Sequence, residues 1–152
     1  DLIATATAHV EAETGKALIA QTWRVFLDDW PASEILELPV APARAIDEIR
    51  VYDAAGDPQV ASGWTLDAAS DPPRLHLPAR PLVGRPLNGV EIDVVAGFGE
   101  AATDVPDTLR RAVLVLVAHW YELRGAAGDA ALVAAIPPGF ARLIAPFRRP
   151  LL

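Results

Sequence analysis

The period of the hydrophobic positions changes twice along the chain. Over residues 1–15 apolar side chains recur every three or four positions, which predicts a helix that ends at a glycine. Between about residues 20 and 97 the period falls to two, as in "TWRVFL", and this alternation is typical of half-buried strands. From about residue 106 the helical period returns. The pattern therefore predicts helices at both ends and a β-rich insertion between them.

Turn-forming residues divide the insertion into short strands. Stretches such as "AAGDP", "ASDPP" and "LNG" supply the Gly, Asp, Asn and Pro that chain reversals favour. Prolines within "LPVAPARA" and "LPARPLVGRP" disfavour central ladder positions, so we expect edges or loops there. The strands that we expect are Trp23–Leu27, Ile35–Leu38, Ile46–Tyr52, Gly63–Leu66, Arg74–Leu77 and Val90–Val95.

The segment "DVPDTLRRAVLVLVAHWYELRG" predicts a long helix at about residues 106–124. Its apolar positions cover most of the circumference, so we expect several neighbours to bury it. The residues expected in its buried core are Leu109, Val113, Leu116, Val117, Trp120 and Tyr121.

A shorter helix is expected at about residues 138–146, because Pro146 disfavours its continuation. The order of elements predicts an α+β fold, in which packed helices carry an inserted small antiparallel β unit. We expect a single domain over residues 1–146, followed by a tail at 147–152.

Composition narrows the class of protein. The chain has 152 residues, of which 52% are hydrophobic and 22% charged, and this balance indicates a globular domain. It contains no cysteine, which excludes disulfides, thiolate metal sites and a cysteine nucleophile. The net charge of −7 opposes free binding to nucleic acid. The longest apolar run, Ala112 to Ala118, is too short for a membrane span. The start at Asp1, without a methionine, suggests a truncated N-terminus.

Two stretches resemble sites of chemistry. In "AHWYELR", His119 precedes Glu122 by one helical turn, but no second histidine at helical spacing completes a metal motif. Gly97-Phe98-Gly99 lies between a strand and a helix, but lacks the lysine and third glycine of phosphate loops. We interpret both as structural. The residues alone indicate no catalytic, cofactor or metal site.

The remaining carboxylates do not form an acid/base pair. Asp28-Asp29 and Asp47-Glu48 are neighbours in strand-like segments, where successive side chains point to opposite faces. Asp67 and Asp71 flank a turn, where an aspartate commonly bonds the local backbone.

The C-terminus, "PFRRPLL", is basic and apolar in an otherwise acidic chain. Such a tail either folds back on its own domain or docks on a partner, because arginine and aromatic anchors are favoured at interface centres. We predict docking, through Phe147, Arg148, Arg149, Leu151 and Leu152.

Several of these segments together resemble one known family. "ETGKALIAQTW", "ELPVAPARAIDEIRVYDAAG" and "DVPDTLRRAVLVLVAHWYE" are similar to the head–tail connectors (adaptor or head-completion proteins) of long-tailed phages. The resemblance is greatest to the adaptors of alphaproteobacterial prophages and gene transfer agents, and it covers nearly the whole chain. Members carry a further N-terminal helical segment.

The resemblance implies a connector-type adaptor fold and a non-enzymatic role in the neck of a phage-like particle assembled in the bacterial cytoplasm. It implies a homo-oligomeric ring of about a dozen copies, with closed heterologous contacts. The portal would lie above the ring and a stopper or tail-completion protein below it. Double-stranded DNA would pass through without specific binding, since acidic walls repel phosphates. No cofactor and no membrane is implied. The alternatives are a stopper or tail-completion protein of the same particle, or a small-ligand-binding or enzymatic α+β domain.

Overall fold

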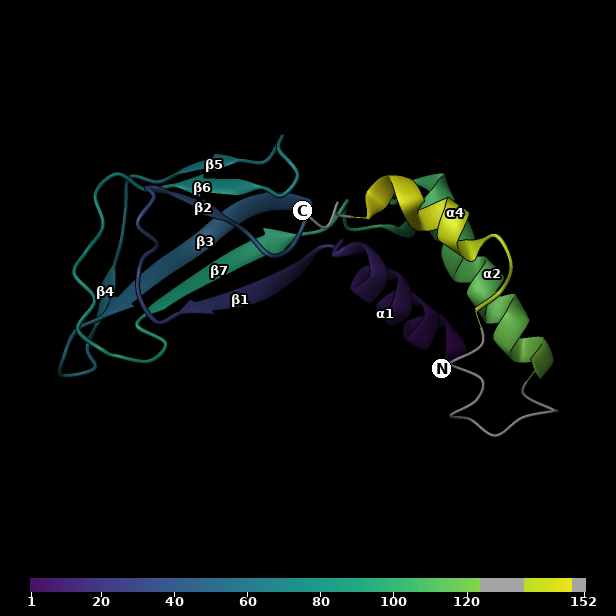
Figure 1. Cartoon of the computed structure of the whole chain (residues 1–152), viewed down its shortest axis with the longest axis horizontal. Helices are drawn as coiled ribbons and strands as arrows, with labels where there is room; N and C mark the ends of the chain where they lie inside the picture. Colours follow the sequence, from purple (N-terminus) through teal and green to yellow (C-terminus); the bar gives the residue numbers. More distant parts are fainter. Residues whose placement is uncertain (124–135, 149–152) are drawn as a thin grey trace. The chain divides into compact units, whose positions relative to one another are not determined.

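The computed structural model describes residues 1–123 and 136–148, and within them the chain forms two compact units (Figure 1). Unit 1 consists of Asp1–Ile19 and Phe98–Leu152, and unit 2 of Ala20–Gly97. Unit 1 contains the helices α1 (Leu2–Thr14), α2 (Asp107–Leu123) and α4 (Phe140–Ile144), with the short 3-10 helices η1 (Ala102–Asp104) and η2 (Ala145–Phe147). Unit 2 contains two antiparallel sheets. The predicted α+β class is confirmed.

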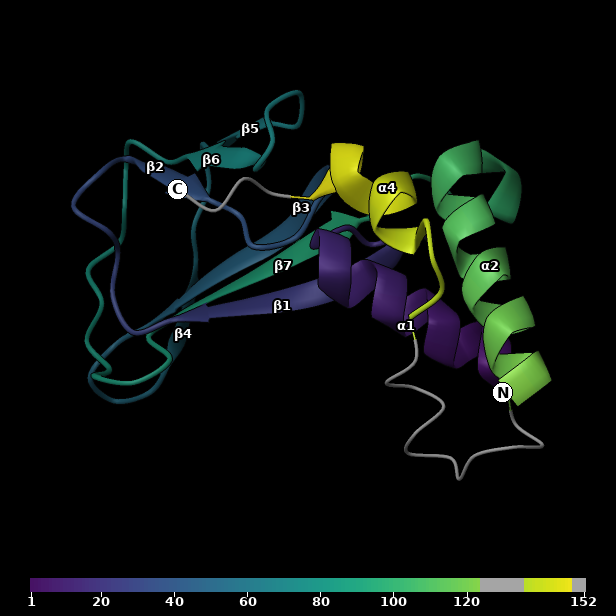
Figure 2. The same ribbon diagram turned by 45° about the vertical axis from the view of Figure 1, so that its right-hand side comes forward.

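Helices α1, α2 and α4 of unit 1 pack around one apolar cluster (Figure 2). Its largest side chain is Trp120, which is fully buried. The Asp1 carboxylate caps α1 by accepting a hydrogen bond from the Ile3 amide at 3.1 Å, and Gly15 ends the helix in the left-handed region at φ 67°. The buried members of the cluster are Ala6, Val10, Leu18, Val105, Leu109, Ala112, Leu116, Trp120, Phe140 and Ile144.

The structure corrects the predicted core of α2. Leu109, Leu116 and Trp120 are buried, and Val113 and Val117 pack against the same cluster. Tyr121, however, is 57% exposed. The prediction assumed neighbours on all sides, but α1 and α4 cover only part of the circumference. Leu114, two helical turns before Tyr121, is 65% exposed for the same reason.

Unit 2 is built on an antiparallel sheet of four strands in the order β1-β7-β3-β4, with a second sheet of three in the order β2-β6-β5. The strands are β1 (Gln21–Leu27), β2 (Ile35–Glu37), β3 (Ala43–Tyr52), β4 (Pro58–Val60), β5 (Thr65–Asp67), β6 (Arg74–His76) and β7 (Val90–Ala96). Strand β4 was not among the expected strands, because it begins with a proline directly after the "AAGD" turn. A short edge strand tolerates that proline.

The alternating side chains of the inner strand β7 give the two faces of the larger sheet different chemistry. Ile92 and Val94 point into the core and are fully buried. Glu91 and Asp93 alternate with them and point to the other face. The edge strand β1 pairs with β7 along its whole length, from Gln21↔Ala96 to Leu27↔Val90. Trp23 of β1 is 42% exposed, because β1 is an edge strand.

Candidate functional site

The structure gives His119 and Glu122 no shared role in chemistry. Both lie on α2, where His119 is half-buried and Glu122 exposed, and no hydrogen bond joins them. A different histidine contributes to the core. His9 of α1 packs edge-on against Trp120 at a centroid distance of 5.9 Å, and against Phe140 at 5.6 Å. The sequence around His9, "ATAHVEA", gave no indication of this packing.

The two glycines of "GFG" have conformational and steric roles. Gly97 has φ 133°, which L side chains rarely adopt. A Cβ on Gly99 would lie 2.2 Å from Oδ2 of Asp104. That carboxylate accepts a hydrogen bond from the Ala101 amide at 2.9 Å, which fixes the entry into η1. The segment therefore forms a tight backbone turn.

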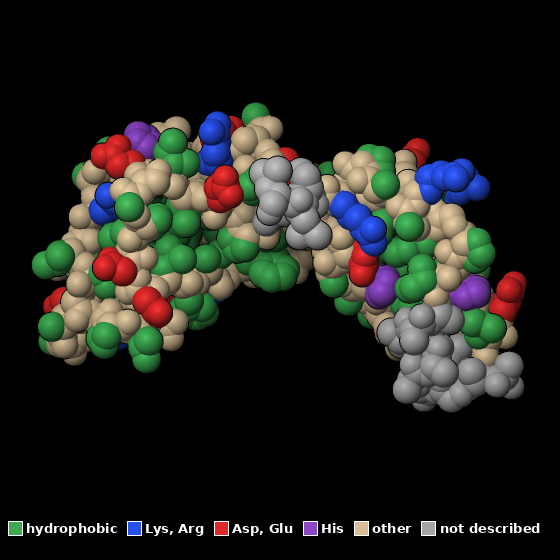
Figure 3. Space-filling view, in the orientation of Figure 1, with side chains coloured by type: hydrophobic (Ala, Val, Ile, Leu, Met, Phe, Trp, Pro, Cys, Tyr) green, Lys and Arg blue, Asp and Glu red, His purple; other side chains and the backbone are tan. Residues whose placement is uncertain are grey.

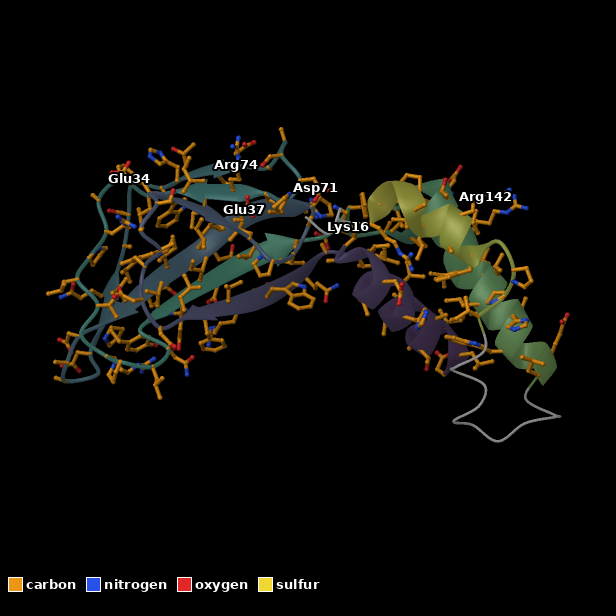
Figure 4. The ribbon with its side chains drawn as sticks, viewed as in Figure 1. Lys16, Glu34, Glu37, Asp71, Arg74 and Arg142 are labelled. Carbon is orange, nitrogen blue, oxygen red and sulfur yellow. The ribbon has the colours of Figure 1, made fainter. Side chains whose placement is uncertain are left out.

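The carboxylates of Asp28 and Asp29 each accept a hydrogen bond from a backbone amide. Asp28 accepts a hydrogen bond from the Asn88 amide at 2.9 Å, and Asp29 from the Trp30 amide at 2.7 Å. Asp67 accepts from the amide of Ala69 at 3.1 Å, as the turn predicted. A hydrogen bond from Arg74 additionally lowers the pKa of Asp67. Arg74 and Glu37, which face one another across β6 and β2, are labelled in Figure 4.

The outer face of the larger sheet carries a network of alternating charges that the sequence analysis missed. Asp93 accepts two hydrogen bonds from Arg24 of β1, at 2.7 and 3.0 Å, and one from Arg50 of β3 at 3.0 Å. Arg50 also reaches Glu48, and Tyr52 donates to Glu91 at 3.0 Å. The sequence did contain a signal of this network, because acidic residues alternate with apolar ones along β7 and arginines occur in the neighbouring strands β1 and β3.

These contacts shift ionisation equilibria in the network, including those of Asp93 and Tyr52. The hydrogen bond from Arg24, reinforced by Arg50, outweighs burial and lowers the pKa of Asp93. The bond to Glu91, together with burial, raises the pKa of the Tyr52 phenol. With Arg85, which lies 4.0 Å from Glu91, three arginines face the three carboxylates Glu48, Glu91 and Asp93, and the network ties three strands together.

The first part of the C-terminal tail contacts unit 1. Phe147 ends η2 and packs against the helical core, and Arg148 forms an ion pair with Glu13 of α1. This observation moves the start of any free tail beyond Arg148. Arg149, Leu151 and Leu152, the other predicted docking residues, lie outside the described residues.

An apolar groove of about 930 Å³ runs along unit 1. Helix α1 contributes Ile3, which is 59% exposed, and α2 contributes Leu114, which is 65% exposed. The groove is also lined by Arg110 and Arg111. Arg110 pairs with Asp107, but its Nε is buried without a hydrogen-bond partner in the described part of the chain.

Within residues 1–123 and 136–148, no cluster of His, Asp and Glu could hold a metal ion. No helix of these ranges is long and apolar enough to cross a bilayer.

Comparison with known proteins identifies the family. No family model and no curated protein matches the chain. Solved structures include a chain from the neck of a native GTA particle computed with C12 symmetry. It is 35% identical with a TM-score of 0.80, over 99% of this chain and 81% of that one. The chain belongs to the neck proteins of gene transfer agents.

Two further structures agree with this assignment. A chain from the neck of an empty GTA particle, computed with C6 symmetry, is 35% identical with a TM-score of 0.81, over 99% of this chain and 76% of that chain. A chain from the virion of a native gene transfer agent particle is 33% identical with a TM-score of 0.81, over the same shares. The predicted resemblance to head–tail connectors is confirmed.

Proposed function

We propose that the chain is the head–tail adaptor of a gene-transfer-agent-like particle, in which it has a structural role without catalysis. Copies form a closed ring in the neck, below the portal and above a stopper or tail-completion protein. The observation that carries the proposal is the 35% identity over 99% of the chain to a neck protein. That neck was computed with C12 symmetry, so we expect the ring to contain twelve copies of the chain.

The charge of the chain fits a passage for DNA. The net charge is −7, and carboxylates are spread over the β-rich part of the face shown in Figure 3. Acidic walls repel the phosphates of a duplex and let it slide, whereas clustered lysine and arginine would hold it. We infer that the ring extends the DNA channel without binding DNA specifically, after assembly in the bacterial cytoplasm.

The position in the neck can be tested directly. An affinity-tagged chain is expressed as the sole copy in a producer strain, and the purified particles are imaged by cryo-electron microscopy. We expect twelve copies in contact with the portal. A ring elsewhere in the neck, or another copy number, would favour a stopper or tail-completion role.

The C-terminal tail provides the proposed contact with the portal. Phe147 and Arg148 anchor its start to unit 1. Docking then depends on Arg149, Leu151 and Leu152, because an arginine can pair with carboxylates while leucines fill pockets. Deletion of residues 149–152 should leave the melting temperature unchanged and abolish capture by the portal. Retained capture would exclude docking, and a large drop in melting temperature would assign the tail to the domain itself.

A further inference from the structure

The apolar groove of unit 1 is an exposed hydrophobic surface of the kind that marks protein interfaces. Ile3 and Leu114 lie on different helices and are both more than half exposed. The fold of unit 1 gains nothing from leaving two large aliphatic side chains in water. A closed ring, in contrast, requires two different complementary surfaces on each copy. The groove has the exposed apolar side chains that such a surface needs.

Charge indicates which surface fits the groove. Unit 2 contains 12 Asp and Glu but 6 Arg, whereas unit 1 contains 8 Asp and Glu against 7 Lys and Arg. The units therefore carry net charges of −6 and −1. Exposed Arg111 at the groove makes no ion pair within the described ranges. An acidic partner surface would complement it, and unit 2 of another copy is such a surface.

Within unit 2, strand β1 offers an aromatic anchor close to two exposed carboxylates. Phe26 is 50% exposed on the outer face of this edge strand. Asp28 and Asp29, which are also exposed, come directly after the strand ends at Leu27. Val60 of the short edge strand β4 is 63% exposed but is smaller than an aromatic side chain, and Leu82 and Leu87 are exposed by 90% and 67%. Their loop also carries arginines, which the basic side of the groove would repel.

We propose that the groove between α1 and α2 receives the β1 surface of the neighbouring copy in the ring. Phe26 of that copy enters the apolar part beside Ile3 and Leu114. Asp28 and Asp29 face Arg111. The contact is heterologous, since each copy offers its groove to one neighbour and its β1 surface to the other. This inference rests on the proposed ring.

The absence of cysteine from the chain makes a clean cross-linking test possible. Phe26→Cys and Leu114→Cys are introduced together, and the variant replaces the native chain in producer cells. Purified particles are treated with a short flexible bismaleimide, and the chain is followed on a denaturing gel. We expect a ladder of dimers, trimers and higher multiples. Each single-cysteine variant is the matched control and should stay monomeric, because a heterologous contact never brings two identical positions together.

The outcomes separate this contact from the proposed function. If particles carry the chain as a ring but the double variant stays monomeric, the groove contact is wrong and the adaptor role stands. Equal cross-linking of a single variant would indicate a symmetric contact and overturn the proposal. If the native chain forms no ring in the neck, the proposed function itself fails. Should the pair impair assembly, Asp29→Cys with Ile3→Cys repeats the test.

A charge reversal gives an independent readout. Arg111→Glu should reduce incorporation of the chain into particles on the order of tenfold, because every copy of a ring repeats the defect. Arg142→Glu is the matched control, since Arg142 is exposed on α4 and does not line the groove (Figure 4). Both variants should melt like the native protein. Equal loss of incorporation for both would overturn the proposed pairing.

Discussion

Trp120 and Tyr121 are neighbours in the sequence, but only the first is enclosed by other helices. Trp120 is fully buried against His9 and Phe140, whereas Tyr121 is 57% exposed. Removing a buried aromatic leaves a cavity that the surrounding helices cannot fill, and exposed positions lack this penalty. At this end of α2 we therefore expect the stability of the protein to depend on Trp120 and much less on Tyr121.

We expect Trp120→Ala to reduce the free energy of unfolding by about 3–5 kcal/mol. Tyr121→Ala should cost less than about 1 kcal/mol, and His119→Gln should change little, since neither side chain is fully buried. The three variants are compared by urea unfolding, monitored by far-UV circular dichroism because one of them removes a tryptophan. Similar losses for Trp120→Ala and Tyr121→Ala would contradict the packing of α2.

Asp93 connects three strands through ionic hydrogen bonds, and this makes unit 2 sensitive to acid. Arg24 and Arg50 lower the pKa of Asp93 in the folded state. Its value in an unfolded chain is about 3.9. The ion pairs therefore stabilise the fold fully above that pH, and the contribution is lost as the pH falls through the lower folded-state pKa.

Asp93→Asn should consequently destabilise the protein at pH 6, and the difference from the native chain should shrink steadily below about pH 4. Unfolding by urea at several pH values measures this. Asp57→Asn, at an exposed turn carboxylate, is the control and should leave the acid limb of the native profile unchanged. A difference for Asp93→Asn that stays constant down to pH 2 would show that its ion pairs do not contribute.

At the scale of elements, the turn before α2 depends on the close approach of Gly99 and Asp104. A Cβ at position 99 would lie 2.4 Å from the Cβ of Asp104, and rotation of the aspartate cannot relieve that contact. We expect Gly99→Ala to destabilise the protein by about 1–3 kcal/mol. Asp104→Ala would remove the hydrogen bond from the Ala101 amide, but it would keep the Cβ of residue 104, which still lies too close to a Cβ at position 99.

A double-mutant cycle therefore tests the turn. Asp104→Gly removes all three side-chain atoms that Gly99→Ala would meet, so the double variant should be more stable than the two single effects added together predict. Thermal or urea unfolding of the four proteins gives the coupling. Strict additivity would mean that the clash does not limit the turn.

The sequence predicted the elements whose patterns are local. The helix before Gly15, the strands that alternate apolar and polar residues, and the long helix after Pro106 all have their own periodicity and caps. The missed features depend on partners distant in the sequence. The exposure of Tyr121 reflects which side of α2 the other helices leave open. The Asp93 network requires β1 and β3 on either side of β7, which composition alone does not specify.

At the scale of the whole molecule, unit 2 has the character of an inserted domain. Its first strand residue, Gln21, pairs with Ala96 near its end, so the two ends of the unit are adjacent. In unit 1, the Phe98 amide donates to the Leu18 carbonyl at 3.1 Å, so the two chain segments that lead to the insertion are also adjacent. Adjacent ends and a separate core are the conditions under which a domain tolerates excision.

Unit 2 also buries its own apolar side chains. Leu75, Ile49 and Ile92 are almost completely buried within it, which is the core that independent folding requires. We therefore expect residues 20–97, produced alone, to fold cooperatively with the chemical shifts of the intact chain. The reciprocal protein, in which a short flexible linker joins Ile19 to Phe98, should retain helical circular dichroism and a cooperative melt, because the helical core of unit 1 contains no residue of unit 2. Ile92→Ala in the excised unit is a control that should abolish its cooperative unfolding. If residues 20–97 stay unfolded while the intact chain melts in one transition, the two units depend on one another for stability.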